Sequence, residues 1–218
     1  MVANINSSAI HDLKKLVAEG EGLQLEFKRK AAYPDKVVRE LIAFANTEGG
    51  TLLIGVDDDG SIPGTKYPEE ELHVVQEALK KFCRPALVFH ATTIRISENR
   101  SVVRIDVPQS ERRPHALALS ESQREYTVRY EDKSVKATKE MKEIIQRSKK
   151  KKDIRFVFGE PEKKLMQFLE HHPKITLSQF QKLTGLNRFR SARKLILLVL
   201  ANVLKIHPTE KGDLYERK

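Results

Sequence analysis

Residues 43–60 read AFANTEGGTLLIGVDDDG, a sequence in which a helical pattern gives way, after two glycines, to a run of apolar residues. Upstream of the glycines, apolar residues recur at helical spacing, which predicts a helix that starts with Asp35 as its N-cap and ends near Asn46. Downstream, the apolar run 52–56 predicts a buried strand that ends in an Asp- and Gly-rich turn. Helix, glycine turn and central strand should therefore form one unit.

Gly49 and Gly50 lie at the break between the two patterns and permit positive φ angles and close approach of the backbone. A tight reversal from helix to strand needs these properties, and so does a phosphate-binding loop. The Walker spacing and its lysine are absent from this segment, so the glycines alone favour a structural turn. A nucleotide-binding switch that uses Gly49 and Gly50 is the weaker alternative.

Five segments, in this order along the chain, carry a resemblance to a known family. They are EGLQLEFK at 21–28, AFANTEGG at 43–50, LIGVD at 53–57, RPH at 113–115 and YTVRY at 126–130. Together they resemble the Schlafen-AlbA domain family over about residues 15–147. The resemblance implies an α+β fold for this part of the chain, with a mixed sheet flanked by helices.

Length, cysteine content and hydropathy exclude several classes of protein. At 218 residues, the chain is long enough for two modest domains that each bury a core. One cysteine, Cys83, excludes an internal disulfide framework, and we find neither an apolar run of membrane-spanning length nor a signal-peptide pattern. We expect a cytoplasmic protein without a membrane partner.

Charge is distributed unevenly between the two parts of the chain. Residues 1–136 contain 20 Lys and Arg against 21 Asp and Glu, whereas residues 137–218 contain 20 against 9. The formal charges are therefore −1 and +11. Basic side chains that reach phosphates release counterions, so this segregation predicts a nucleic-acid partner, with DNA favoured over RNA.

The alternating pattern of residues 23–28 predicts a half-buried strand with Glu26 and Lys28 on its polar face. A carboxylate and a lysine at this spacing can share a metal ion and a scissile phosphate, although a solvated strand face has the same pattern. Glu21 could join Glu26 if Gly22 interrupts the strand register. With Asp57, these acids would offer hard oxygen ligands that suit magnesium or manganese, although no cofactor is certain.

The Schlafen resemblance gives these acids a specific role. In Schlafen-type ribonucleases, residues at the positions of Glu21, Glu26 and Asp57 form the metal-binding catalytic set, and Lys28 would then stabilise phosphate charge. The three acids are necessary for this chemistry but do not suffice for it. The resemblance also implies that His115 lies near the site, whereas a lone histidine after a proline is more often an exposed loop residue.

A run of four lysines predicts the domain boundary, because consecutive like charges repel one another and stay solvated. We expect a first domain at 1–147, a basic linker at 148–159 and a second domain at 160–218. The candidates for nucleic-acid contact are Arg129, Lys149, Lys150, Lys151, Lys152, Arg188, Arg190, Arg193 and Lys194.

The second domain should be a small winged helix-turn-helix. Helical patterns around 165–169, 177–183 and 188–204 precede a two-stranded pattern at 205–217, and this order resembles the winged-helix family. In the third helix we expect Phe189, Leu195, Ile196, Leu198 and Val199 to be buried. Arg190, Arg193 and Lys194 should share an exposed face that points toward DNA.

Two main functions follow, and the sequence leaves both open. The favoured one is a DNA-binding transcriptional regulator that contacts DNA through its winged helix. The alternative is a divalent-metal-dependent endoribonuclease that uses Glu21, Glu26 and Asp57. We also expect a homodimer, because Schlafen proteins pair two such lobes within one chain and this sequence contains one.

Overall fold

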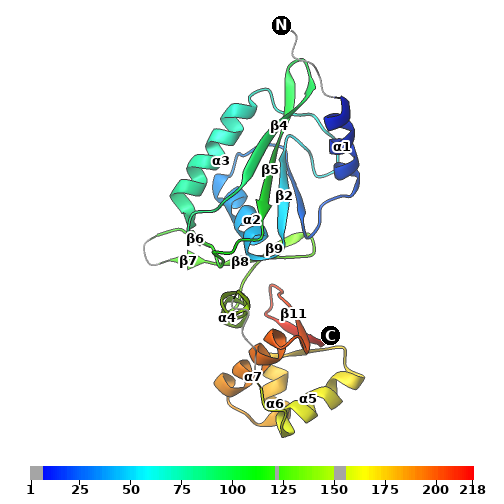
Figure 1. Ribbon diagram of the computed structural model, residues 1–218, viewed down its shortest axis with the longest axis vertical. Helices are drawn as coiled ribbons and strands as arrows, with labels where there is room; N and C mark the ends of the chain where they lie inside the picture. The colour runs from blue at the N-terminus through cyan, green and yellow to red at the C-terminus, as the bar shows by residue number, and fades with distance from the viewer. Residues whose placement is uncertain (1–6, 121–122, 150–155) are drawn as a thin grey trace. The chain divides into compact units, whose positions relative to one another are not determined.

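The computed structural model describes residues 7–120, 123–149 and 156–218 and divides into two compact units, Met1–Ser134 and Val135–Lys218 (Figure 1). Both units combine helices with strands, so the predicted α+β class is confirmed. The division precedes helix α4 (Lys139–Ser148), whereas the sequence suggested a boundary after this segment. None of the helices in the described ranges is long and apolar enough to cross a membrane.

The first unit is built on a mixed four-stranded sheet. Its strands, in spatial order, are β1 (Leu25–Lys28), β2 (Gly49–Ile54), β5 (Arg100–Pro108) and β4 (His90–Ser97). Strands β1 and β2 are parallel, and helix α2 (Pro34–Asn46) connects them. Strand β5 runs antiparallel to both of its neighbours.

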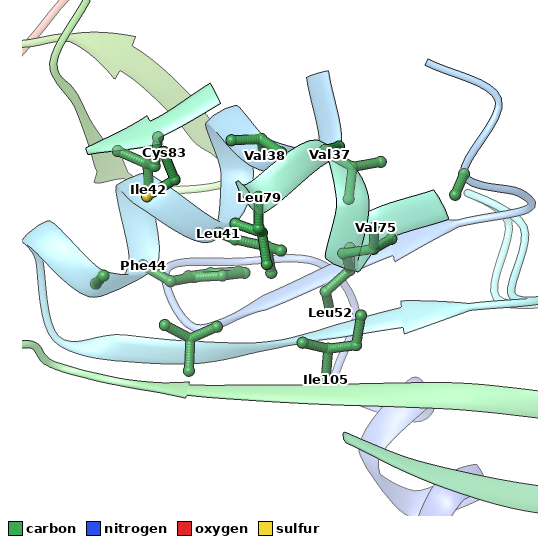
Figure 2. Packing of buried hydrophobic residues seen from close by; sticks show 14 of the residues in the cluster. Val37, Val38, Leu41, Ile42, Phe44, Leu52, Val75, Leu79, Cys83 and Ile105 are labelled. Carbon is green, nitrogen blue, oxygen red and sulfur yellow. The ribbon is translucent and has the colours of Figure 1, made fainter. Parts of the chain in front are cut away.

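Alternate residues of β2 enter two different cores. Leu52 and Ile54 pack against α2 and α3 (Pro68–Phe82), as Figure 2 shows for Leu52. Leu53 points to the opposite face and packs with α1 (Ser7–Ala18). The continuous apolar run therefore reflects a strand covered by helices on both faces.

The N-cap of helix α2 lies two residues before the position that we predicted. This N-cap is Tyr33, and Pro34 occupies the start of the helix, where a missing N–H group costs nothing. Asp35 is therefore not the N-cap. It lies in the first turn, where its carboxylate interacts favourably with the helix dipole.

Short strands extend the first unit beside α2. Strands β3 (Cys83–Arg84), β6 (Ala116–Ala118) and β7 (Arg124–Glu125) form one small sheet, and β8 (Thr127–Tyr130) pairs with β9 (Lys133–Lys136).

A buried amide joins α2 to these strands. The Asn46 side chain donates from Nδ2 to the carbonyl groups of His115 and Thr127, each at 2.9 Å, and its Oδ1 accepts from the His115 amide at 2.7 Å. His115 is itself fully buried, so the expectation of an exposed loop histidine was wrong. Its ring nitrogens lie 2.9 Å from the Pro85 carbonyl and 2.7 Å from Ser110 Oγ. His115 therefore fixes loops together in the interior.

The second unit contains four helices and a three-stranded antiparallel sheet in its described part. After α4 come α5 (Glu160–His171), β10 (Lys174–Thr176), α6 (Leu177–Thr184), α7 (Arg188–Leu200), β11 (Leu204–His207) and β12 (Leu214–Arg217). The strand order is β10-β12-β11. Residues from all three last helices and from β12 share one core, which includes Leu165, Phe180, Leu195 and Tyr215.

The burial of α7 agrees with the predicted pattern except at its start. Leu195, Ile196 and Leu198 are buried as expected, and Val199 is partly buried. Phe189 is 74% exposed, so its predicted burial was wrong. A helix turns about 100° per residue, and Phe189 therefore points nearly opposite to the buried Ser191 two positions later.

Candidate functional site

Glu26 and Lys28 lie together on β1, as predicted, but Glu26 does not face solvent. Its side chain is only 9% exposed, and its Oε2 lies 2.9 Å from Arg129 Nη1. Lys28 Nζ binds the other carboxylate oxygen. The Glu26 carboxylate therefore has a cation on each side.

Glu21 lies just before β1, where its Oε1 accepts a hydrogen bond from the Phe27 amide at 2.7 Å. Partial burial raises the pKa of Glu21 above its usual range, and the Glu26 carboxylate raises this pKa further. Glu21 and Glu26 are thus close enough to repel each other, which agrees with the expectation that Gly22 interrupts the strand.

Asp57 has a different partner. Its Oδ2 lies 2.5 Å from Arg29 Nη1 and accepts a longer hydrogen bond, 3.3 Å, from Ser61 Oγ. Across residues 7–120, 123–149 and 156–218, no group of three or more His, Cys, Asp and Glu side chains is placed to hold a metal ion. As arranged, Glu21, Glu26 and Asp57 do not fit one magnesium or manganese ion, and that assignment stays a prediction.

Arg129 does not face phosphate, so this expectation was wrong. Its side chain is fully buried, with Nη1 2.7 Å from Glu40 Oε2 and Nη2 donating to the Gly22 carbonyl at 2.5 Å. The guanidinium carbon also lies 4.9 Å from the centre of the Phe44 ring. Arg129 therefore joins β8, β1 and α2 in the interior through paired charges.

The glycine turn is filled by the protein's own atoms. Gly49 has a φ of 82°, and a Cβ added to it would lie 2.8 Å from the Val107 carbonyl oxygen. A Cβ added to Gly50 would lie closer to Cδ1 of the Phe44 ring than van der Waals contact allows. Both glycines are therefore explained by the tight turn and by packing.

A cleft of about 740 Å³ opens beside this turn and has an acidic lining. Its charged groups include Glu19, Glu21, Glu48 and Asp106, and no Lys or Arg is among the described residues that line it. A phosphate group would meet repulsion there. The cleft gives no support to nucleotide binding at Gly49 and Gly50.

Substitution of Gly50 tests the structural role of the turn. Gly50→Ala should lower the free energy of unfolding by about 1–3 kcal/mol, because the new methyl group must displace the Phe44 ring. Gly22→Ala is the matched control, since nothing lies within 4 Å of its added Cβ, and it should change stability by less than about 0.5 kcal/mol. Urea denaturation measures both changes, and equal effects would contradict the packing argument.

Helix α7 presents the best candidate surface for nucleic acid. Asn187 caps the helix, and its Oδ1 accepts from the Arg190 amide at 2.9 Å. Arg190 and Arg193 are exposed, and neither forms an ion pair with any residue that the structure describes. Both guanidinium groups are therefore available to a ligand.

The other predicted basic residues differ from this pair. Arg188 Nη2 lies 3.0 Å from Glu140 Oε1, and Lys194 Nζ lies 2.5 Å from Glu162 Oε1. The side chain of Lys149 is exposed at the end of α4, whereas Lys150, Lys151 and Lys152 lie outside the described residues. An ion-paired residue must give up its partner to bind phosphate, so Arg190 and Arg193 are the stronger candidates.

Comparisons with known proteins identify a family for the first unit. Residues 21–138 match the family described as Schlafen, AlbA_2. No curated protein matches the sequence.

Two solved structures show limited similarity. The DIP2311 protein from Corynebacterium diphtheriae is 20% identical with a TM-score of 0.47, and the match covers 67% of this chain and 29% of that protein. The N-terminal domain of a RecG-related protein from Nitrosomonas europaea is 26% identical with a TM-score of 0.37, and the match covers 47% of this chain and 73% of that domain. The chain thus spans less than a third of the length of the DIP2311 protein.

Proposed function

We propose that this chain, which belongs to the Schlafen, AlbA_2 family, binds nucleic acid and acts as a DNA-binding transcriptional regulator. Family membership supports the nucleic-acid-binding role. The observation that carries the finer proposal is the exposed pair Arg190 and Arg193 on α7, in the strongly basic part of the chain. Phosphates bind such groups with release of counterions.

The order of elements in the second unit supports α7 as a recognition helix. Helix α6 ends at Gly185, which has a φ of 72°, and the chain then turns into α7. The β11–β12 hairpin follows α7, in the position of a wing. Residues 160–218 are therefore proposed to be a winged helix, preceded by a basic linker that includes Lys149.

Duplex DNA is the proposed partner because of groove dimensions. The major groove of B-form DNA admits an α-helix, whereas the major groove of A-form RNA is too deep and narrow for side chains to read. We further propose that two chains bind as a homodimer, since a two-fold pair of recognition helices would match two half-sites.

Removal of the two guanidinium groups tests this function. Arg190→Ala combined with Arg193→Ala should weaken binding to duplex DNA roughly tenfold and lower the salt dependence by about two phosphate contacts. Fluorescence anisotropy of the full-length chain at several salt concentrations measures both effects.

The matched control removes two charges elsewhere in the same unit. Lys163 and Lys164 are exposed on α5, and their combined replacement by alanine should leave the salt dependence nearly unchanged. The same loss in both variants would show that only total charge matters and would overturn the assignment of α7.

The ribonuclease alternative has less geometric support. Glu26 would have to leave Arg129, and Asp57 would have to leave Arg29, before these acids could share a metal ion. Cleavage of single-stranded RNA in manganese, but not in chelator, would nevertheless restore that alternative.

A further inference from the structure

Phe189 is an unusual residue on α7 because its ring faces solvent. At 74% exposure it is the most exposed aromatic residue in the described part of the chain. Other apolar residues of α7, including Leu195 and Leu198, are buried in the core. The core of the second unit therefore does not account for a phenyl ring at this position.

Two arginines with no ion-pair partner among the described residues lie near the ring in the helix. Arg190 follows Phe189 in sequence and Arg193 lies four positions after it on the same face, whereas Arg188 before it is paired with Glu140. A ligand that binds this face must therefore carry negative charge and also offer an apolar group to the ring. A duplex with thymine in the major groove has both, because the thymine C5-methyl group is the apolar feature of that groove.

We propose that Phe189 is a specificity-determining residue that contacts thymine methyl groups in the major groove, while Arg190 and Arg193 bind phosphates. The inference rests on the proposed function, since it requires α7 to bind duplex DNA. Phe189 lies in the first turn of α7, the part of a recognition helix that contacts base edges. Its ring has only two rotatable bonds and therefore loses little conformational freedom on binding.

A local structural role is the competing explanation. A hollow of about 340 Å³ between α4 and α7 has Phe189 in its lining, beside Glu143, Ala192 and Ile196. If Phe189 only covers this hollow, its removal should change stability without changing any preference between DNA sequences. The test must therefore separate base preference from affinity.

The test compares thymine with deoxyuridine, which lacks only the C5-methyl group. Full-length protein first selects duplexes from a randomised pool, and the enriched duplex is then made in thymine and deoxyuridine forms. The wild-type chain should bind the deoxyuridine form about fourfold more weakly, the effect of one buried methyl group. Phe189→Ala should bind both forms with equal affinity and keep the wild-type salt dependence.

Phe158→Ala is the matched control, because Phe158 is 52% exposed in the same unit but lies outside α7. This variant should retain the fourfold preference for thymine. Equal binding of both forms by the wild type, or an unchanged preference in Phe189→Ala, would overturn the inference. Affinities of Phe189→Ala that equal those of the wild type for both forms would likewise overturn it.

Failure of the proposed function has a different signature. If the wild-type chain enriches no duplex and binds no duplex from the pool, then the DNA-binding role itself is wrong. If binding persists and depends on Arg190 and Arg193 but ignores the methyl group, then only the role of Phe189 is wrong.

Discussion

Replacement of Arg129 by methionine should lower the free energy of unfolding of the first unit by about 3–5 kcal/mol. The guanidinium group of Arg129 lies between the Glu26 and Glu40 carboxylates, at 2.9 and 2.7 Å, and none of its side chain is exposed. Methionine keeps much of the side-chain volume but removes the positive charge. Two carboxylates would then lose their shared cation in a poorly solvated interior, which is the costly way to break a buried ion pair.

The matched control applies the same substitution to an exposed ion pair. Arg29 pairs with Asp57 at 2.5 Å, but its side chain is 64% exposed, so Arg29→Met should cost less than about 1 kcal/mol. Urea denaturation with hydrogen exchange resolved by residue would assign each loss to the first or second unit.

Neutralisation of the acids should recover part of the loss. In a chain that carries Arg129→Met, adding Glu26→Gln and Glu40→Gln removes the two carboxylate charges that have lost the guanidinium group, and stability should rise again. An unfolding free energy of Arg129→Met within about 1 kcal/mol of the wild-type value would contradict the interpretation that Arg129, Glu26 and Glu40 form a stabilising buried ion-pair network.

This network shows what strand periodicity can and cannot reveal. The alternation in residues 23–28 correctly placed Glu26 and Lys28 on one face, and it correctly identified that face as polar. Periodicity does not say what covers a polar face. Arg129 and Glu40 come from 103 and 14 positions away along the chain, and only the folded structure brings them to Glu26.

Local chemistry explains why the central turn could be predicted. Gly49 and Gly50 mark the change from a period of 3.6 residues to an apolar run, and helix α2 and strand β2 lie on either side as expected. The start of α2 was misassigned because Pro34 shifts the N-cap to Tyr33. Short elements such as β10, with three residues, give too little pattern to be recognised.

The candidate interface on α7 was predictable in outline. Helical spacing identified Arg190 and Arg193 as exposed residues, and the structure agrees. Helical spacing could not reveal that Arg188 and Lys194 are ion-paired, because their acidic partners are 48 and 32 positions away in sequence. Phe189 was misjudged because an apolar residue was assumed to face the core.

A second large effect should appear in the pH dependence of the second unit. Asp213 lies just before β12, is 8% exposed, and accepts a hydrogen bond from Thr138 Oγ1 through Oδ2. Its Oδ1 and the buried Tyr215 hydroxyl have no hydrogen-bond partner among the residues that the structure describes. Burial raises the pKa of Asp213 to about 6, and the Glu140 carboxylate adds to the rise.

The sign of the effect follows from this raised pKa. The folded chain holds a proton on Asp213 up to about pH 6, whereas the unfolded chain releases it near 3.8. The contribution of Asp213 to the free energy of unfolding is therefore fully present below pH 3.8 and is lost as the pH rises through 6. The full loss is about 3 kcal/mol, of which about 2 kcal/mol should fall between pH 4.5 and 7.5.

Asp213→Asn isolates this contribution, because asparagine keeps the shape and the acceptor for Thr138 but cannot ionise. The difference in unfolding free energy between wild type and Asp213→Asn should therefore change by about 2 kcal/mol between pH 4.5 and 7.5, with the wild type losing more. Glu140 on α4 also acts on Asp213, and Arg188 on α7 acts on the Tyr215 phenol of β12, but these groups are common to both proteins. A difference that stays constant with pH would show that Asp213 is ionised throughout, and the buried oxygen would then need a hydrogen-bond donor such as an ordered water molecule.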